Sequence, residues 1–373
     1  MTTIINNENK KLNVPNLRFP EFQGEWEKST LDKVCVFHNG RAYKQNELLQ
    51  SGKYRVLRVG NFFTNDSWYY SNLELEEEKM AVRGDLLYAW SASFGPRFWH
   101  EEKVIYHYHI WKVDSFQNVT KRYLYYYLEK DATKIKNEVQ GGTMVHITKG
   151  DMEKRAITYP CVEEQKKIAK LLSLFDERIA TQHKIIDKLQ SLIKGIRVRL
   201  VQIEKGNIVH LNEIASIYQP QTISSTELTE DGFLVYGANG IIGKYKDYNH
   251  KTEQICITCR GNTCGMVNYT KPMSWITGNA MVINTDEHLN VVCKRYLFHY
   301  LSAYNFNRII SGSGQPQIVR TPLEKLEITL PSILEQEQKA MLLDRIQAKI
   351  ENCNRVLSLY QEQKQYLLRQ MFI

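Results

Sequence analysis

Two loops rich in small residues carry side chains that can make paired hydrogen bonds. They are Arg260, Asn262 and Thr263 on one turn and Gln315, Gln317 and Arg320 around another. Arginine and side-chain amides match the planar donor and acceptor patterns of base edges. Glycines such as Gly312 and Gly314 let a backbone approach a phosphate without a Cβ in the way. Binding is therefore the chemistry that these residues can supply, and the alternative for each of them is an ordinary surface turn.

The first half of the chain offers a matching set of loop residues. They are Ser91, Ser93, Arg97, Gln140, Gly141, Gly142 and Thr143. Asn239 and Ser313 extend the set in the second half. Trp90 ends an apolar strand just before the first of these loops and is interpreted as a core residue. The candidate binding residues thus fall on loops in both halves of the chain.

Several motifs that suggest sharper chemistry fail on their spacing. Cys256 and Cys259 stand three positions apart in a strand-like run, so strand alternation points them to opposite faces. This argues against a zinc site completed by Cys264 and Cys293, and we expect no metal. Residues 237–244 resemble a phosphate-binding loop but have one residue too many between the glycines, followed by a Tyr where Ser or Thr is needed.

Composition leaves room for two domains and favours a polyanion as partner. The 373 residues include 49 Lys and Arg against 41 Asp and Glu, a net charge of +8, which is a weak signal on its own. The longest apolar runs fall well short of the ~20 residues of a membrane span, and the polar segment 1–11 does not look secretory. The seven cysteines are odd in number and scattered, as expected for reduced thiols in a cytoplasmic protein.

The second half of the chain repeats the first at a distance of about 171 residues, which sets the frame for these loops. Pro160 and Pro331 are each followed at the same offset by Glu-Gln and then by a long helix. The repeat predicts four segments: a globular module at 1–160, a long helix at 161–206, a second module at 207–332 and a second helix at 333–373.

Each module is predicted to mix short strands with helices. The strand candidates are 54–59, 85–90 and 104–113 in the first module, and 233–236, 254–259 and 281–283 in the second. A helix is expected to follow Lys121 and Lys294. Thr148 and Thr321 are predicted to cap one short helix each, with Pro322 at a first helical position.

The long helices carry apolar residues at alternating steps of four and three, which keeps one seam facing a partner. The predicted seam residues are Leu172, Phe175, Ile179, Ile186, Leu189 and Ile196 in the first helix, and Leu343, Ile346, Ile350, Leu357, Tyr360 and Leu367 in the second. Gln182 and Lys364 are polar exceptions that can fix the register. A helix of about 40 residues is about 60 Å long, too long for one ordinary domain to cover, so we expect the helices to pack on each other.

The predicted fold is therefore an α/β (α+β) protein with two copies of a globular module, alternating with two long helices packed as an antiparallel coiled coil and related by a pseudo-twofold axis. These features resemble the specificity subunit of type I restriction-modification systems over nearly the whole chain. The resemblance depends on the repeated Pro and Glu-Gln junctions, on residues 160–169 closing the first module, and on residues 236–243 opening the second.

The resemblance implies a function in DNA recognition. Each module would be a target recognition domain that contacts one half of a bipartite, asymmetric site in double-stranded DNA through the loop residues named above. The helices would set the spacer between the halves and dock two methyltransferase subunits, to which restriction and translocase subunits add. S-adenosylmethionine, ATP and Mg are then expected on those partners and not on this chain. The second junction departs from the family at Gln338 and Lys339, where an aliphatic residue matching Ile168 is expected.

Catalytic signatures of such systems are missing from the sequence itself. An amino-methyltransferase needs Asn-Pro-Pro or Asp-Pro-Pro, and none of the nine prolines is next to another. A nuclease that begins on Pro-Asp is excluded because no proline precedes an aspartate. His107 and His109 share a predicted strand face and are interpreted as a structural pair. We expect enzymatic activity to belong to partner subunits; the alternative function is a coiled-coil interaction scaffold with incidental basic charge.

Overall fold

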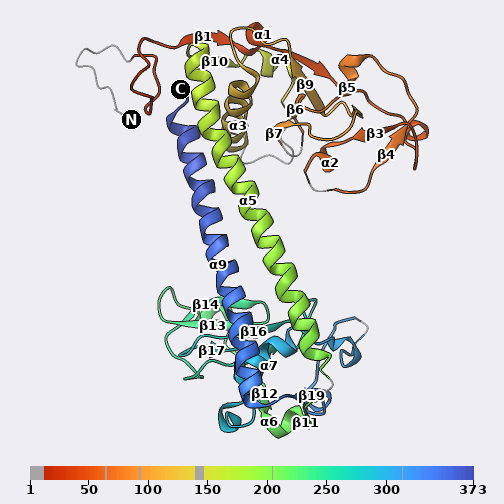
Figure 1. Cartoon of the computed structure of the whole chain (residues 1–373), viewed down its shortest axis with the longest axis vertical. Coiled ribbons are helices and arrows are strands. Elements are labelled where there is room, and N and C mark those ends of the chain that lie inside the picture. Colours follow the sequence, from red (N-terminus) through yellow and green to blue (C-terminus); the bar gives the residue numbers. More distant parts are fainter. Residues whose placement is uncertain (1–11, 64, 92–93, 139–146, 204, 313) are drawn as a thin grey trace. The chain divides into compact units, whose positions relative to one another are not determined.

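The computed structural model describes residues 12–63, 65–91, 94–138, 147–203, 205–312 and 314–373. The chain divides into two compact units, which we call unit 1 (Met1–Thr181 with Leu357–Ile373) and unit 2 (Gln182–Val356). Two long helices, α5 (Val162–Val201) and α9 (Ile333–Gln370), each contribute one part to unit 1 and the other to unit 2 (Figure 1). No helix in the described ranges is long and apolar enough to cross a membrane.

The described part of unit 1 holds three sheets. Their strand orders are β1 (Glu27–Thr30) with β10 (Ala156–Tyr159); β2 (Val36–Asn39), β9 (Ile110–Asp114), β6 (Leu86–Ala89), β7 (Gly95–Phe98); and β4 (Tyr69–Ser71), β3 (Tyr54–Leu57), β8 (Val104–Tyr106), β5 (Met80–Ala81). The helical elements are α1 (Leu31–Val34), η1 (Gln45–Glu47), α2 (Val59–Phe63), η2 (Glu77–Lys79), α3 (Lys121–Glu138) and α4 (Lys149–Glu153).

Unit 2 repeats this plan in its described residues. The strand orders are β11 (Asn207–His210) with β19 (Glu327–Leu330); β12 (Ser216–Tyr218), β18 (Ala280–Asn284), β15 (Ile255–Thr258), β16 (Val267–Tyr269); and β14 (Gly240–Tyr245), β13 (Phe233–Gly237), β17 (Trp275–Ile276). The helical elements are α6 (Leu211–Ile214), η3 (Ser225–Glu227), η4 (Asp286–His288), α7 (Lys294–Leu301), η5 (Phe306–Arg308) and α8 (Arg320–Glu324). Both units also share one parallel pairing, β3 with β8 and β13 with β17, so the predicted internal repeat is confirmed.

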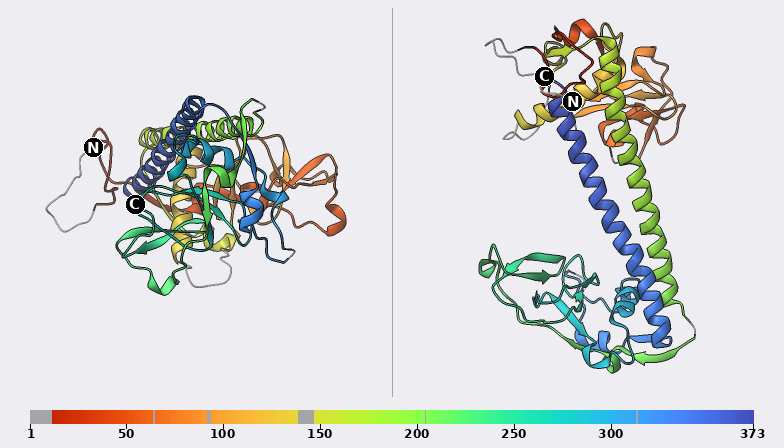
Figure 2. Two further views of the ribbon diagram at one scale, coloured as in Figure 1. Left: turned by 90° about the horizontal axis from the view of Figure 1, so that it is seen from below. Right: turned by 60° about the vertical axis from the view of Figure 1, so that its left-hand side comes forward.

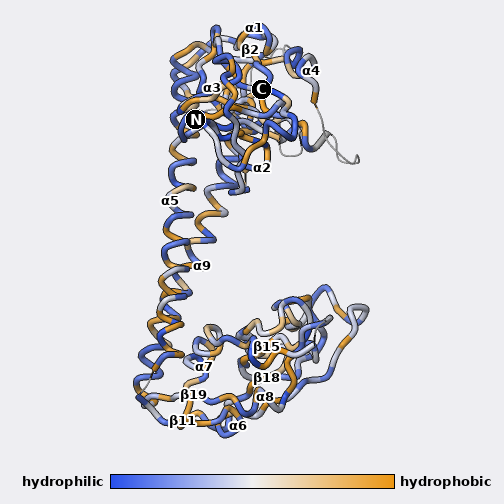
Figure 3. Tube along the Cα trace, turned by 90° about the vertical axis from the view of Figure 1, so that its right-hand side faces the viewer, coloured by the Kyte–Doolittle hydropathy of each residue, from blue (hydrophilic) through white to orange (hydrophobic). Residues whose placement is uncertain are grey.

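The central strands separate two hydrophobic cores, and strand alternation explains how. In β6, Leu86 and Tyr88 face the larger core of unit 1, whereas Leu87 and Ala89 face a smaller one. In β15 of unit 2 the same alternation sends Ile257 to one core and Cys256 to the other. Each fully buried aliphatic side chain contributes on the order of 2 kcal/mol. Figure 3 shows the hydrophobic colour gathered along β15 and β18.

The long helices pack on each other, as predicted from their heptad pattern (Figure 2). Within unit 1, the contacts Asp176 to Lys364 and Arg178 to Tyr360 run in opposite chain directions, so the pair is antiparallel there. Every predicted seam residue is buried or half-buried. Gln182 donates from Nε2 to the backbone oxygen of Cys353 at 3.2 Å within unit 2. This polar contact specifies one register of the seam.

Several local predictions need correction. Residues 104–113 form two strands and not one, because residues 107–109 make the turn between β8 and β9, so His107 and His109 do not share a strand face. Thr148 caps α4 by accepting the N–H of Asp151 at 3.1 Å, as predicted. Thr321, in contrast, lies inside α8, whose N-cap is Val319. The preceding loop is already paired to Cys259 through Ile318, and the helix begins two residues earlier than predicted.

Candidate nucleic-acid interface

Loops that are far apart in the sequence meet in unit 2. The β15–β16 loop and the loop before α8 are joined when Gly261 donates its N–H to the oxygen of Pro316 at 3.0 Å and Ile318 donates to that of Cys259 at 3.0 Å. The result is a surface, here called the polar loop surface, formed by candidate residues from three loops. Its members are Asn239, Arg260, Asn262, Thr263, Gln315, Gln317 and Arg320. All are exposed except Thr263, which is half-buried.

The β13–β14 hairpin contributes Asn239 to this surface. Its tip is held in place because Thr263 donates its hydroxyl to Asn239 Oδ1, and Asn268 donates from Nδ2 to the Ala238 oxygen at 3.5 Å. Residues 237–244, which resemble a phosphate-binding loop in sequence, therefore form the turn and second strand of a hairpin. A phosphate-binding loop would lead into a helix instead.

A tight turn orients the glutamines of the polar loop surface. Ser311 and Gln317 exchange backbone hydrogen bonds of 2.9 and 2.8 Å across it. Gly312 has a φ of +92°, and a Cβ there would lie 2.4 Å from the backbone oxygen of Gln315. Only glycine fits this position because of the turn itself, and the approach of a phosphate to this loop stays a prediction. Gln315 and Gln317 project from the turn as exposed amides, whereas Ser313 lies outside the described residues.

Arg260 offers the strongest recognition chemistry of the polar loop surface. It lines a cleft of about 350 Å³ together with Gln219, Gln317 and Arg320. Arg320 already pairs with Glu324 at 2.7 Å, whereas the described part of the chain holds no ion-pair partner for Arg260. A free guanidinium beside a free amide is the pairing that matches guanine and adenine edges in the major groove.

Sequence reasoning missed Gln219, which follows β12. Its Nε2 donates to the Gly278 oxygen at 3.2 Å and to Cys259 Sγ at 3.2 Å, so it supports the floor of the same cleft. The available signal was the run of two glutamines, a proline and a threonine at residues 219–222, directly after the apolar Ile217 and Tyr218.

In unit 1, Arg97 is the candidate residue that the structure places most clearly. It lies on β7 with its guanidinium 4.8 Å from the ring centre of Phe63 and 5.9 Å from that of Phe62. It lines a groove of about 1080 Å³ whose other cations are Arg83, Lys121, Arg122, Lys136 and Lys364. This excess of cations suits a phosphate backbone. Glu129, Asp176 and Glu177 also line the groove.

The remaining candidates of unit 1 divide into two groups. Ser91 is only 5% exposed, so it does not form part of an open surface. Ser93, Gln140, Gly141, Gly142 and Thr143 lie outside the described residues. Trp90, predicted as a core residue, is half-buried and stacks on Trp111 with ring centres 5.6 Å apart.

The connection between β3 and β4 in unit 1 is a second element that sequence reasoning missed. It takes the place of the short β13–β14 turn and includes α2. Arg58 donates to the oxygen of Ser67 at 3.2 Å and lies 4.3 Å from the ring centre of Tyr69. Asn61 donates to the oxygen of Asn65 at 2.8 Å, which closes the loop. The available signal was the group of polar residues at 64–67, which follows the first strand candidate.

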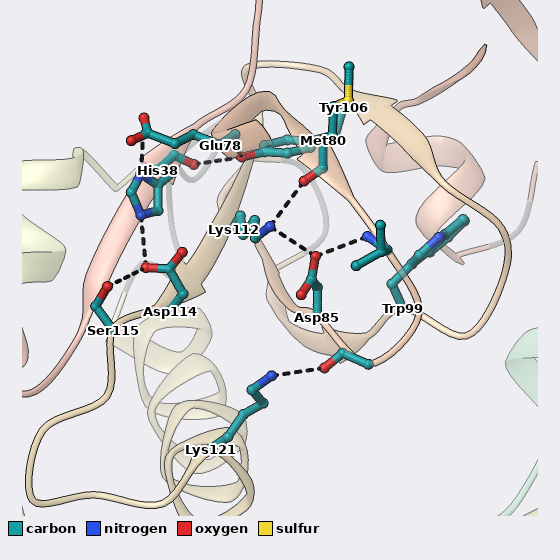
Figure 4. Close-up of polar contacts among 12 residues, drawn as sticks. His38, Glu78, Met80, Asp85, Trp99, Tyr106, Lys112, Asp114, Ser115 and Lys121 are labelled. Carbon is teal, nitrogen blue, oxygen red and sulfur yellow. Dashed lines mark hydrogen bonds and ion pairs between the residues drawn. The ribbon is translucent and has the colours of Figure 1, made fainter. Parts of the chain in front are cut away.

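A polar network fixes the sheets of unit 1 beneath these loops (Figure 4). Lys112 on β9 pairs with Asp85 at 3.0 Å and donates to the oxygen of Met80 on β5 at 3.2 Å. His38 on β2 contacts Asp114 at 2.8 Å from Nε2. Because Lys112 links β9 to a strand of the other sheet, it holds the two sheets in one arrangement.

The fold and the loop surfaces define the class of protein. It has two copies of one α/β module and two long paired helices, and the exposed loops of the modules carry hydrogen-bonding side chains. The family model of the type I restriction modification DNA specificity domain matches residues 23–191 and 204–358. The chain belongs to this family.

Relatives of known name agree with the family assignment. The chain is 26% identical over 244 residues to the Escherichia coli type I restriction enzyme EcoprrI specificity subunit, covering 60% of each protein. It is 24% identical over 322 residues to the Methanocaldococcus jannaschii type I restriction enzyme MjaVIII specificity subunit, covering 74% of this chain and 75% of the relative. The match thus spans less than two thirds of the E. coli protein.

Solved structures share the fold. The S subunit of a type I restriction-modification system from M. genitalium superposes with a TM-score of 0.69 at 18% identity, covering 96% of this chain and 99% of that one. A second structure, from work on complex assembly and conformational transition of the type I R-M system, gives a TM-score of 0.56 at 15% identity, covering 93% and 97%. At these identities the likeness extends to the fold alone.

Proposed function

We propose that this protein is the DNA sequence-recognition subunit of a type I restriction-modification complex, in which each unit contacts one half of a bipartite, asymmetric site. The observation that carries the proposal is that two modules of one fold present different exposed hydrogen-bonding side chains. Unit 2 offers Arg260 and Gln317, and unit 1 offers Arg97 beside a cationic groove. Different chemistry on one frame is what an asymmetric DNA site requires.

Apolar residues outside the helix seam support the docking of two methyltransferase subunits on the long helices. Besides the buried seam, α5 and α9 expose large apolar side chains to solvent. They are Val162, Leu174, Ile185, Leu192 and Val198 on α5, and Leu334, Met341, Leu342, Leu359 and Tyr366 on α9. Exposed apolar residues in such number on a helix favour partner contacts. Restriction and translocase subunits, with S-adenosylmethionine, ATP and Mg, complete the proposed complex in the cytoplasm, and this chain contributes recognition without catalysis.

Genome-wide mapping of N6-methyladenine tests the proposal. In cells that carry the partner subunits, we expect a bipartite motif with an unread spacer that disappears when this gene is deleted. The purified complex should bind DNA containing that motif with an affinity that falls steeply as salt rises, because several phosphates are neutralised. Methylation that is unchanged by the deletion would contradict the proposal and favour the interaction scaffold.

A further inference from the structure

In unit 2, the turn between β17 and β18 lies directly beside Arg260. Cys259, which precedes the arginine, donates its backbone N–H to the oxygen of Asn279 at 3.3 Å. Gly278 occupies the tip of the turn, and a Cβ there would lie 2.6 Å from Thr222 Oγ1. At this place unit 2 therefore presents Arg260 and the exposed Asn279, and position 278 adds no side chain.

Unit 1 has the same turn, between β8 and β9, but its exposed side chain lies on the turn and not on the neighbouring strand end. Trp90 donates its backbone N–H to the oxygen of His109 at 3.1 Å, which is the corresponding position in the strand ladder. Ser91 then takes the place of the arginine and is only 5% exposed. Tyr108 takes the place of the glycine and is 38% exposed. Unit 1 thus presents an aromatic side chain where unit 2 presents a guanidinium.

The turn supports Tyr108 rigidly. The backbone N–H of Tyr108 donates to the backbone oxygen of Arg41 at 3.1 Å. The backbone oxygen of Tyr108 accepts from Trp90 Nε1 at 2.8 Å. The rings of His107 and His109 lie 4.5 and 3.9 Å from the Tyr108 ring, between centres. An aromatic side chain that is packed on its neighbours and already ordered loses little conformational entropy when it binds a ligand.

The surroundings of Tyr108 are polar and aromatic, and Arg41, whose backbone contacts the tyrosine, is already paired. Arg41 forms two hydrogen bonds with Glu47, at 3.0 and 2.7 Å. Burial, with His109 nearby, lowers the pKa of His107 to about 4, so this ring is neutral near pH 7. The turn itself therefore offers hydrogen bonds and apolar contact to a base.

We propose that Tyr108 is a specificity-determining residue of unit 1, which contacts a base of the half-site that unit 1 recognises. The inference rests on the proposed function. A phenol hydroxyl both donates and accepts a hydrogen bond, and a ring edge offers apolar contact to a thymine methyl group. Tyr108 thus does in unit 1 what Arg260 does in unit 2, from the neighbouring turn and not from the corresponding residue.

The experiment maps methylated motifs in cells that express the full complex. The variants are Tyr108→Gly, which copies the turn of unit 2, and Tyr108→Phe, which removes only the hydroxyl. Tyr70→Phe, a half-buried tyrosine on β4 of the same unit, is the matched control, and Arg260→Ala reports on unit 2. Thermal unfolding of each purified variant checks that it folds.

We expect Tyr108→Gly to relax one position of a single half-site, with the other half-site and the spacer unchanged. Tyr108→Phe should lower discrimination at the same position by roughly two- to tenfold, as expected for one hydrogen bond. Tyr70→Phe should leave the motif as it is, and Arg260→Ala should affect the other half-site.

Two results would overturn the inference, and they are distinguishable. If a folded Tyr108→Gly complex methylates the parent motif at the parent rate while Arg260→Ala alters its half-site, Tyr108 has no role in specificity and the proposed function stands. If the parent protein directs no sequence-specific methylation in the presence of its partners, the proposed function and this inference fail together.

Discussion

Gln165 and Gln336, which lie 171 positions apart, make the same set of hydrogen bonds in their two units. Gln165 accepts the N–H of Thr120 at 2.7 Å and donates to the oxygens of Asn118 and Pro160 at 2.8 and 2.9 Å. The partners of Gln336 are Cys293 N–H at 2.9 Å and the oxygens of Val291 and Pro331 at 3.1 and 2.9 Å. Each buried amide thus fastens a long helix to the start of the module helix, which explains why the Glu-Gln junction occurs twice.

Replacement of either glutamine should destabilise its own unit. In Gln165→Ala or Gln336→Ala, buried backbone groups lose their partners, which costs about 2 to 4 kcal/mol. The free energy of unfolding in urea measures the loss. Gln190→Ala, at an exposed position of α5, is the control and should change it by less than about 0.5 kcal/mol. Equal stability of Gln165→Ala and the control would mean that the junction has no fastening role.

Lys364 is a buried charge of the helix seam in unit 1. Its ammonium lies 2.7 Å from Glu129 and 2.6 Å from Asp176, and its side chain is 7% exposed. Lys364→Met leaves two carboxylates without their cation, so we expect a loss of about 3 kcal/mol in stability. Combining it with Glu129→Gln and Asp176→Asn should restore much of that loss. Arg369→Met, at an exposed position of α9, is the control; a single variant as stable as this control would contradict the prediction.

The stability of unit 2 should depend on pH through His299. Burial lowers its pKa from the ordinary 6.5 to about 4, although its Nε2 contacts Asp344 at 2.8 Å. Between these values the unfolded chain binds the proton and the folded one does not. The contribution is therefore fully present above about pH 6.5 and is lost as the pH falls toward about 4, by roughly 3 kcal/mol.

Urea unfolding at about pH 7 and about pH 4.5 measures this dependence. In His299→Gln the group that titrates is gone, so the difference between the two pH values should shrink even if the variant is less stable at neutral pH. A difference as large as that of the parent would assign the acid sensitivity to other groups.

Arg260 should specify one base in the half-site of unit 2. Arg260→Ala is expected to cost about 1 to 3 kcal/mol of discrimination at one position and to leave the rest of the motif intact. Arg260→Lys is the matched control, because it keeps the charge but loses the planar fork that binds guanine in a bidentate manner. Binding assays with single-base variants of the motif measure both. If Arg260→Ala instead weakens binding to every variant of the motif equally, Arg260 contacts a phosphate and not a base.

The sequence predicted the repeat, the long helices and most strands, because these depend on local periodicity. Pro160 and Pro331 mark corresponding ends of β10 and β19 in the structure. Contacts between distant segments were not predictable in this way. Nothing local indicates that Gln317 pairs with Arg260, that Gln219 supports their cleft, or that His107 turns out of a strand. The loop residues were chosen by type, and only the tertiary pairing shows which of them share a surface.

The glutamate of the repeated Glu-Gln junction also has contacts that the local sequence does not predict. Glu164 forms a buried, bidentate ion pair with Arg18, with both distances 2.8 Å. Its counterpart Glu335 is exposed and instead accepts from Ser332 at 3.1 Å. Identical sequence motifs therefore place the glutamine alike and the glutamate differently, because only unit 1 supplies an arginine at that site.

The last prediction concerns the spacer between the half-sites. α5 is one continuous helix that runs from unit 1 into unit 2, so an insertion of four residues adds about 6 Å and a rotation of about 40°. Gln182 contacts Cys353 across the seam, so a matched insertion after Gln182 and before Cys353 keeps the pairing on both sides. Two base pairs add about 7 Å and about 70° of twist, so the unread spacer should lengthen by one to two base pairs. The half-sites should stay the same, since each loop keeps its place within its unit. Mapping of methylated motifs measures the spacer, and an insertion in α5 alone is the control that should lose activity. Retained activity with an unchanged spacer would leave the helices only a docking role.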